Sequence, residues 1–384
     1  MHAVKLCGPR NKLSRRRKIL VTGANGFLGK NLVFRLKELL DVEVIPFVRG
    51  EDPNNLSGMV LSVDAIFHLA GVNRPKNNSD FSKINIGLTE TLCNAVRSSG
   101  RNIPIIFTSS TQAEYDNPYG KSKLAAESML RTLASDIDCA VYVYRLPGVF
   151  GKWCLPNYNS VVATFCYNIS RGIPIVVNNP ETVIQIAYVD DVVDEFLRVL
   201  TEDRVGFSVE SLPKSYSISL GKLVQKIHAF NESRHSLITE RVGDGLVRAL
   251  YSTYISNLAP YQFVYDLTKH GDDRGIFVEM LKTPDCGQIS YFTVHPGITR
   301  GSHYHNSKTE KFLVVKGIAQ MRFRHLITRE FYQITVSGDK PQVVESIPGW
   351  VHDITNIGDD DAIVVLWANE IFDGQKPDCF PCRV

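Results

Sequence analysis

Four residues in the last quarter of the chain have the types and spacing of metal ligands. His303 and His305 are one residue apart, Glu310 follows five residues later, and His352 lies further on. Histidines one residue apart on a strand point to the same face, because side chains alternate along a strand. A carboxylate five residues later can return to that face after a bend. Three imidazoles and one carboxylate suit a divalent metal that keeps an open position for substrate, so we predict a metal site here.

A second reactive group lies nearer the N terminus. Tyr119 and Lys123 are four residues apart in a segment predicted to be helical, so they share one helix face. A nearby lysine cation lowers the pKa of a tyrosine, and the phenol can then exchange a proton with a carbonyl or an alcohol near neutral pH. A hydroxyl from the run Thr108–Thr111 would hold the oxygen of that carbonyl.

A glycine-rich turn precedes this group. Gly23, Gly26 and Gly29 lie between an apolar strand pattern and a helical pattern. Such a turn lets the backbone approach a pyrophosphate, which sits at the positive N terminus of the helix. Arg49 follows the second predicted strand, where an arginine accepts the 2′-phosphate of NADP and an acid would bind the ribose of NAD. We therefore predict NADPH as the cofactor.

The elements that carry these residues form two different patterns. Strand and helix patterns alternate from Lys18 to about Tyr144, which predicts an α/β fold with a parallel sheet and helices on both faces. From about Asn257, short strands are separated by Gly, Pro and Asp turns, which predicts an all-β barrel or jelly roll. We predict three parts: a basic, disordered arm at residues 1–17, an NADP-binding reductase domain at 18–250 and an all-β metal domain at 258–384.

Composition excludes several classes of partner. The first 18 residues carry seven Lys and Arg and no acid; without these seven, the 43 basic residues fall to 36 against 40 acidic ones. The mildly acidic remainder argues against nucleic-acid binding. No stretch approaches the ~18 apolar residues of a membrane helix, so we expect no membrane span. Eight scattered cysteines suit reduced thiols, and we expect a cytoplasmic protein.

Residues 18–240 resemble the extended short-chain dehydrogenase/reductase family. The matching pieces are Gly23–Gly29, His68–Gly71, Asn85–Thr89, Tyr119 with Lys123, Arg145–Gly151 and Tyr188–Asp191. The resemblance implies that Tyr119 donates the proton, Lys123 binds the nicotinamide ribose, and a Ser or Thr orients the carbonyl. Ser110 fits the last role best, and Thr111 is the alternative. This branch of the family mostly handles nucleotide sugars.

The C-terminal part carries two resemblances. The spacing of the three histidines and Glu310 resembles the two motifs of the cupin family. The segments Gly271–Glu279 and Arg300–His305 are similar to the dTDP-4-dehydrorhamnose 3,5-epimerase family, whose catalytic histidine matches His303 and acts without a metal. We favour a metal role for His303, because His305, Glu310 and His352 complete a ligand set.

The whole pairing, over about residues 18–384, resembles a family of bifunctional enzymes of capsular polysaccharide synthesis. The matching segments are Leu69–Pro75, Asp116–Gly120, Phe150–Cys154, Pro156–Val161, Leu250–Tyr254 and Glu310–Val315. That resemblance implies C3 epimerisation of a UDP-2-acetamido-2,6-dideoxy-4-ketohexose at a zinc cupin. Reduction at C4 by NADPH would then give UDP-2-acetamido-2,6-dideoxy-L-talose, on the way to UDP-N-acetyl-L-fucosamine for capsule or O-antigen. It also implies a homodimer joined through the cupins.

Two other functions stay open. The cupin could be a metal-free structural or dimerising module, which would leave a single-activity NAD(P)H-dependent nucleotide-sugar 4-reductase. Alternatively, the three histidines and Glu310 could hold iron for dioxygen chemistry.

Overall fold

The structure is a computed structural model that describes residues 15–75, 77, 79–202, 204–268, 270–272, 275–277, 280–281, 287–370 and 374–384. Most of the predicted basic arm lies outside these residues, as does part of the Gly271–Glu279 segment. Contacts divide the chain into two compact units. The α/β unit comprises the described residues up to Val149 together with Gln185–Ser217, and the β unit comprises Phe150–Ile184 together with the described residues from Ile218 onwards.

The α/β unit is built on a six-stranded sheet in the order β2-β1-β3-β4-β5-β8, in which every pair of neighbours is parallel. Its elements are β1 (Arg17–Thr22), α1 (Phe27–Lys37), β2 (Val42–Phe47), a 3₁₀ turn (Pro53–Asn55), α2 (Leu56–Met59), β3 (Ala65–His68), a π-helical turn (Phe81–Ile86), α3 (Gly87–Ser99), β4 (Ile105–Ser110), a 3₁₀ turn (Thr111–Glu114), α4 (Pro118–Ile137), β5 (Ala140–Leu146), α6 (Val189–Val199) and β8 (Gly206–Glu210).

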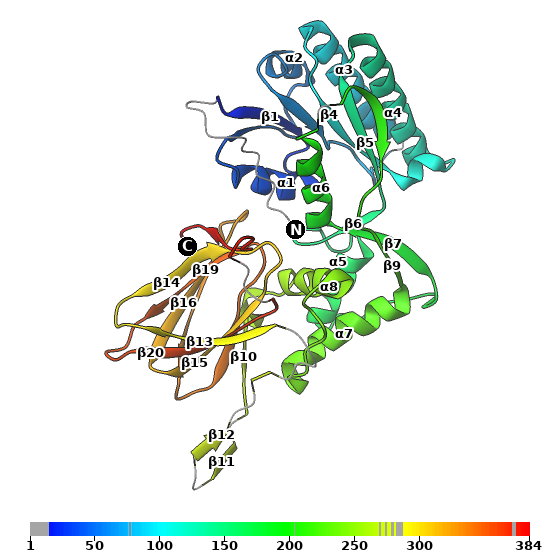
Figure 1. Ribbon diagram of the computed structural model, residues 1–384. Helices are drawn as coiled ribbons and strands as arrows, with labels where there is room; N and C mark the ends of the chain where they lie inside the picture. Colours follow the sequence, from blue (N-terminus) through cyan, green and yellow to red (C-terminus); the bar gives the residue numbers. More distant parts are fainter. Residues whose placement is uncertain are drawn as a thin grey trace. The chain divides into compact units, whose positions relative to one another are not determined.

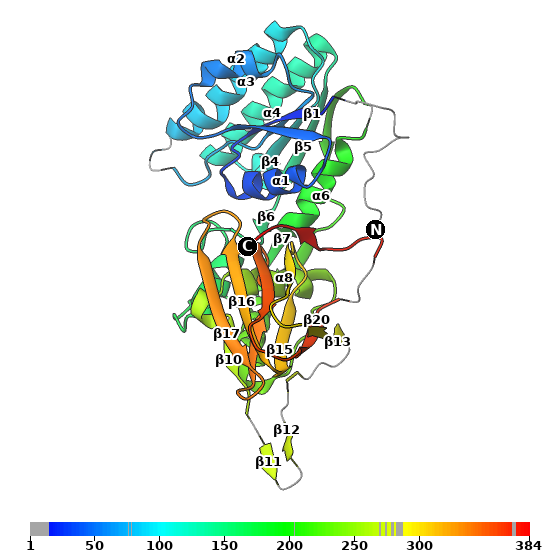
Figure 2. The same cartoon turned by 90° about the vertical axis from the view of Figure 1, so that its left-hand side faces the viewer.

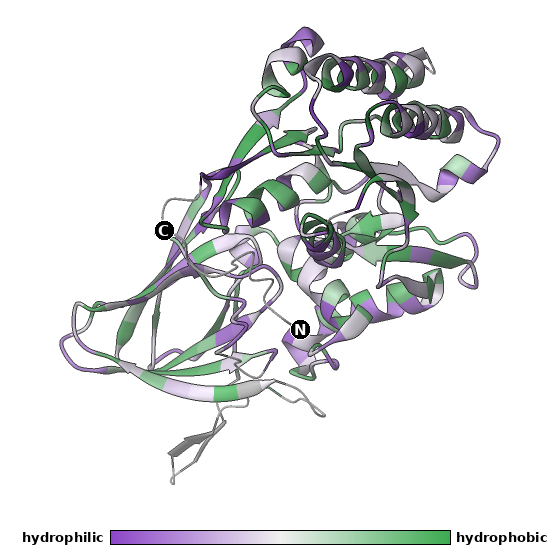
Figure 3. Cartoon of the chain, turned by 45° about the horizontal axis from the view of Figure 1, so that its top comes forward, coloured by the Kyte–Doolittle hydropathy of each residue, from purple (hydrophilic) through white to green (hydrophobic). Residues whose placement is uncertain are grey.

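Helices cover both faces of this sheet (Figure 1). Ile19 and Val21 of β1 pack in one core with Leu32 of α1, whereas Leu20, between them, packs in the opposite core with Leu92 of α3. A strand buried on both faces reads as a continuous apolar run. The parallel sheet with helices on both faces, predicted from the alternation of strand and helix patterns, is confirmed. Figure 3 shows hydrophobic residues along the strands and mixed hydrophobic and hydrophilic residues along the covering helices.

The β unit contains two five-stranded antiparallel sheets, in the orders β10-β18-β15-β20-β13 and β17-β16-β19-β14-β21 (Figure 2). The predicted all-β character of this part is confirmed. Its strands are β10 (Val264–Asp266), β11 (His270–Asp272), β12 (Gly275–Phe277), β13 (Gln288–Val294), β14 (Thr299–Tyr304), β15 (Glu310–Lys316), β16 (Ile318–His325), β17 (Phe331–Ser337), β18 (Gln342–Glu345), β19 (Trp350–Asn356), β20 (Ala362–Ala368) and β21 (Phe380–Pro381).

Three helices that precede these strands in sequence belong to the same unit: α5 (Val161–Ser170), α7 (Leu220–Ser236) and α8 (Gly245–Ser256). A small sheet of β6 (Gly148–Phe150), β7 (Val183–Tyr188) and β9 (Tyr216–Ser219) lies where the chain passes from one unit to the other. Arg234 of α7 forms a buried ion pair with Glu345 of β18 at 2.6 Å, which ties this helix to the strands. Among the described helices, none is long and apolar enough to span a membrane.

Candidate functional site

The glycine turn after β1 is shaped by close backbone contacts. Gly23 has φ +70°, and a Cβ there would lie 2.8 Å from the Cα of Ala70. A Cβ on Gly29 would lie 2.1 Å from the carbonyl oxygen of Gly23. Gly26 is the N-cap of α1, so the first backbone N–H groups of the helix are available to a phosphate. The turn therefore has the geometry that binds a dinucleotide.

The end of β2 lies beside this turn. The backbone N–H of Gly23 donates to the carbonyl of Phe47, the last residue of β2, at 2.8 Å. Arg49 follows two residues later and is exposed. The parallel pairing of β1 and β2 thus places the predicted 2′-phosphate residue at the same sheet edge as the glycine turn.

Helix α4 positions Tyr119 and Lys123. Its N-cap is Asn117, whose side chain accepts from the N–H of Gly120 at 2.8 Å, and Pro118 is its first residue. Proline suits that position because the N–H it lacks would have no partner within the helix. The helix begins at Pro118, so Tyr119 lies in the first turn and Lys123 one turn further on, as the predicted helical segment requires.

The electrostatics of this pair differ from our expectation. The buried Lys123 ammonium donates to the Thr108 carbonyl at 2.8 Å and lies over the Phe107 ring. Burial lowers the pKa of Lys123 to about 8, while Glu127 acts to raise it. Burial raises the pKa of Tyr119, and only a hydrogen bond with Ser110 opposes that change. The prediction that the lysine lowers the tyrosine pKa is therefore wrong for this structure, because desolvation dominates.

The two hydroxyl candidates are in different environments. Ser110 ends β4, is buried, and its Oγ accepts from the N–H of Gln112 at 3.1 Å. It also forms the hydrogen bond that lowers the pKa of Tyr119. Thr111 begins the next turn and is exposed. The structure thus brings Ser110, rather than Thr111, together with Tyr119.

Sequence reasoning missed a buried carboxylate beneath this group. Glu127 accepts from Arg145 at 2.7 and 3.1 Å and from the Ser109 hydroxyl at 2.5 Å. It lies on α4 one turn after Lys123, with its side chain buried. An acid four residues after a lysine, on the apolar face of the helix, is the feature that could have identified it.

The four predicted metal ligands converge in the β unit. His303 of β14 lies directly opposite His352 of β19 in the antiparallel register. His305 follows the end of β14, and Glu310 is the first residue of β15, which belongs to the other sheet. Their ligand atoms all lie within 4.8 Å of one another. The cluster therefore draws on both sheets of the β unit.

Geometry and charge suit a divalent metal. His305 Nε2 lies 2.9 Å from Glu310 Oε2, and His352 Nε2 lies 3.4 Å from the same oxygen. Neither ring nitrogen of His352 has a hydrogen bond among the described residues, and Nε2 has only its 3.4 Å contact with Glu310, so this nitrogen is available to a metal. Burial and the neighbouring His352 and His305 lower the pKa of His303 to about 3. Burial raises the pKa of Glu310, but His305 and His352 more than offset this and leave it well below its usual value. Neutral imidazoles and an ionised carboxylate are the forms that bind metals.

A cavity of about 220 Å³ opens onto this cluster. Its wall includes His303, Glu310 and His352, together with apolar side chains, an arginine and Asp353. The remaining wall residues include Phe292, Arg300, Phe312, Met321, Ile354 and Leu366. Three of the four predicted ligands therefore line a space that a small part of a substrate could enter.

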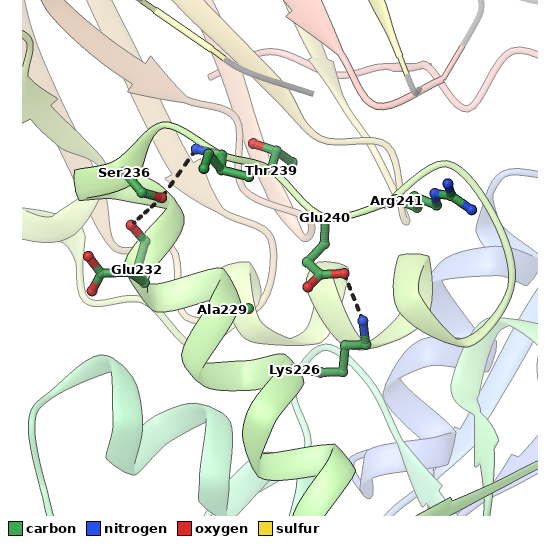
Figure 4. Close-up of a pocket in the computed structure, with 8 residues that line it drawn as sticks. Lys226, Ala229, Glu232, Ser236, Thr239, Glu240 and Arg241 are labelled. Atoms are coloured by element: carbon green, nitrogen blue, oxygen red, sulfur yellow. Dashed lines mark hydrogen bonds and ion pairs between the residues drawn. The ribbon is translucent and has the colours of Figure 1, made fainter. Parts of the chain in front are cut away.

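A larger concavity of about 570 Å³ lies along α7 and the loop after it (Figure 4). Lys226 and Glu240 form an ion pair across it at 2.7 Å, and both are partly exposed. None of the predicted catalytic, cofactor or metal residues lines it. The size of a cavity alone therefore does not identify the candidate site in this structure.

Comparison with known families divides the chain in the same way as its motifs. Residues 19–218 match the NAD dependent epimerase/dehydratase family. Residues 270–380 match the polysaccharide biosynthesis C-terminal domain. The six-stranded parallel fold is also shared with UDP-glucuronic acid 4-epimerase from Bacillus cereus in complex with NAD, at a TM-score of 0.50, 19% identity and coverage of 55% of this chain and 82% of that one.

Two proteins are similar over nearly the whole chain. UDP-2-acetamido-2,6-beta-L-arabino-hexul-4-ose reductase of Pseudomonas aeruginosa is 55% identical over 370 residues, which cover 96% of this chain and 99% of that protein. The crystal structure of the capsular polysaccharide assembling protein CapF from Staphylococcus aureus matches with a TM-score of 0.65 and 41% identity, covering 95% of this chain and all of that one.

Proposed function

The chain belongs to the NAD dependent epimerase/dehydratase family and, over nearly its whole length, to the CapF-like proteins. We propose that it is a bifunctional nucleotide-sugar enzyme. In this proposal the β unit, a zinc cupin, epimerises C3 of a UDP-2-acetamido-2,6-dideoxy-4-ketohexose. The α/β unit then reduces the C4 ketone with NADPH to UDP-2-acetamido-2,6-dideoxy-L-talose, for capsule or O-antigen. The substrate named in the reductase from Pseudomonas aeruginosa supports this assignment.

The observation that carries the proposal is the cluster of three histidines and Glu310, of which all but His303 are fully buried, in the same chain as Ser110, Tyr119 and Lys123. One sugar functional group links the two. A ketone at C4 makes the hydrogen on C3 acidic, and the same ketone is the group that a reductase acts on. Epimerisation followed by reduction explains why one chain contains both sets of residues.

In the α/β unit, each predicted residue has a role at the C4 oxygen or at the cofactor. Tyr119 donates the proton to the oxygen as it becomes an alcohol, and Ser110 holds that oxygen in position. Lys123 binds the nicotinamide ribose. The glycine turn holds the pyrophosphate at the N terminus of α1, and Arg49 holds the 2′-phosphate. NADPH, when bound, supplies the hydride.

In the β unit, His303, His305, Glu310 and His352 would hold the metal. Zinc suits this set, because nitrogen and carboxylate ligands are those it uses in sites that keep an open position. When bound, the metal supplies Lewis-acid polarisation of the sugar carbonyl. The low pKa of His303 keeps its ring neutral, which favours a ligand role for this residue.

We also propose a homodimer joined through the β unit, in the cytoplasm. Strand β13 is at an edge of its sheet, and Ile289 and Tyr291 on it are 61% and 74% exposed. An edge strand with exposed apolar side chains is a surface suited to a second copy.

The six cysteines that the structure describes are all free thiols, which supports a reducing compartment.

Proton NMR in deuterated water, with a UDP-4-keto sugar, tests the proposed function. Without NADPH, the hydrogen on C3 should exchange for deuterium, and with NADPH the talose-type alcohol should form. Reduction without exchange would replace the proposal with a single-activity 4-reductase.

The preference for NADPH is expected to depend on Arg49. Arg49→Ala should lower the ratio of kcat/KM for NADPH to that for NADH by about tenfold or more. The replacement removes the proposed hydrogen bond to the 2′-phosphate, and a charge-assisted hydrogen bond is worth roughly 1.5–3 kcal/mol. Steady-state kinetics with both cofactors measures this ratio. Arg97→Ala, which removes an arginine on α3 that pairs with Asp136, is the control and should leave it unchanged. Equal use of both cofactors by the wild type would contradict the assignment.

The pH dependence of reduction is expected to follow Lys123. Its cation is the form that binds the ribose, so kcat/KM should fall as the pH rises through the lysine pKa of about 8. Glu127 raises that pKa, so Glu127→Gln should move the fall to lower pH. Glu114→Gln is the control, because it also removes a carboxylate that pairs with Arg145, but an exposed one. This replacement should leave the pH profile of kcat/KM unchanged. A profile shared by wild type and Glu127→Gln would exclude this role for Glu127.

A further inference from the structure

The C-terminal segment, residues 374–384, lies directly against the metal cluster. Its strand β21 pairs with β14, with Pro381 opposite His303 and Phe380 opposite Tyr304. The N–H of Cys382 donates to the carbonyl of Ser302 at 2.8 Å. The register of β14 against β19 shifts between Gly301 and His303, and the segment pairs with the part of β14 beyond this shift. It thereby supports the part of β14 that carries the first ligand.

The same segment orients the second ligand. His305 Nδ1 lies 2.5 Å from the backbone carbonyl oxygen of Asp378, so this nitrogen carries the proton and donates it. His305 Nε2, which faces Glu310 Oε2 at 2.9 Å, is then the atom available to a metal. A hydrogen bond of this kind fixes the tautomer and the plane of a ligating imidazole.

The side chain of Asp378 holds the loop between the ligands. Its Oδ1 accepts from the N–H of Asn306 at 2.9 Å. Its Oδ2 accepts from the N–H groups of Ser307 and Lys308, both at 2.8 Å, and from the Ser307 hydroxyl at 3.0 Å. Three successive backbone N–H groups that share one carboxylate form a compact turn. That turn connects His305 to Glu310 and so determines how the two ligands face each other.

Helix α8 supports this loop from another side. Arg248 donates to the Ser307 hydroxyl at 2.6 Å and pairs with Glu370 at 2.7 Å. Its guanidinium lies 4.0 Å from Asp378 Oδ2. Ser252, one turn further along α8, donates to the Ser307 carbonyl at 3.3 Å. The loop is thus held between the helix and the C-terminal segment.

We propose that Asp378 is a positioning residue of the metal centre: its carbonyl sets the orientation of His305, and its carboxylate sets the His305–Glu310 loop. The inference rests on the proposed function, because it needs a metal at this cluster. Residues that orient metal ligands typically change metal affinity by 10–100-fold when they are replaced.

The test uses the full-length protein with Asp378→Asn and Asp378→Ala. Asparagine keeps one oxygen but places an amide NH₂ against a backbone N–H, so we expect about a tenfold weaker zinc affinity. Alanine removes all four hydrogen bonds, and we expect about a hundredfold loss. Zinc affinity is measured by competition with a chromophoric chelator, and visible absorption of the cobalt-substituted protein reports the ligand geometry. If the alanine variant does not fold, the asparagine variant carries the test.

Val336→Ala is the matched control. Val336 is buried in β17, at the edge of the same sheet, so its truncation destabilises the β unit without touching the cluster. Its zinc affinity and cobalt spectrum should equal those of the wild type. The inference about Asp378 would be overturned if both Asp378 variants had wild-type zinc affinity, or if Val336→Ala lost as much zinc affinity as they do. Either result would leave the proposed function standing. A wild type that binds no divalent metal would overturn both the inference and the metal part of the proposed function.

Discussion

Tyr119→Phe is expected to lower the rate of C4 reduction by about 10²-fold or more while leaving hydrogen exchange at C3 intact. The change removes only the phenol oxygen of Tyr119, the proposed proton donor in the first turn of α4, and general acid catalysis by one residue contributes about 10²–10⁴-fold. The β unit contains none of these catalytic atoms, so its chemistry should continue. NADPH oxidation and NMR in deuterated water, on the same sample, measure the two activities separately.

Tyr115→Phe is the control for this experiment, since it makes the same change at an exposed tyrosine four residues earlier. It should reduce the ketone at the wild-type rate. A variant of a predicted metal ligand, such as His305→Ala, should show the opposite pattern from Tyr119→Phe: no exchange, but NADPH oxidation when it is given a ketone that is already epimerised. If Tyr119→Phe remains folded and loses exchange together with reduction, the scheme with two separate sites is wrong.

His303→Ala and His305→Ala are each expected to remove the metal and to destabilise the β unit. The purified wild type should contain about one divalent metal per chain, and each variant almost none, because three remaining ligands hold zinc much less tightly than four. Binding stabilises the folded state, so the variants and the chelator-treated wild type should unfold at lower temperature than the metal-loaded protein. Elemental analysis and thermal unfolding, with and without added zinc, measure both effects.

His295→Ala provides the comparison for these variants. His295 belongs to the same unit but is exposed, where it contacts Asp361 at 2.8 Å. Its replacement should preserve metal content and unfolding temperature. Absence of metal from the wild type and the variants alike would refute the metal site, and retention of metal by His303→Ala and His305→Ala would refute these two residues as ligands.

Local spacing was enough to predict much of the α/β unit. The glycine turn, the buried strands and the Tyr119–Lys123 pair each depend on residues within a few positions of one another, and backbone periodicity converts such spacing into geometry. The same holds for His303, His305 and Glu310, whose close spacing predicted that they meet. These features follow from the sequence by itself because few residues separate the groups involved.

Tertiary structure decided what depends on long-range pairing and on burial. His352 meets His303 because the antiparallel register of β14 and β19 places them opposite each other, which spacing alone does not specify. Asp378, more than seventy residues after His305 in sequence, reaches it only because the C-terminal segment pairs with β14. The direction of the Tyr119 pKa shift depends on desolvation, and therefore on the packing around α4 and not on the nearby lysine. The sequence thus determined which reactive side chains are present and which close neighbours share a face. Strand register and packing determined which distant side chains meet and in which direction their pKa values shift.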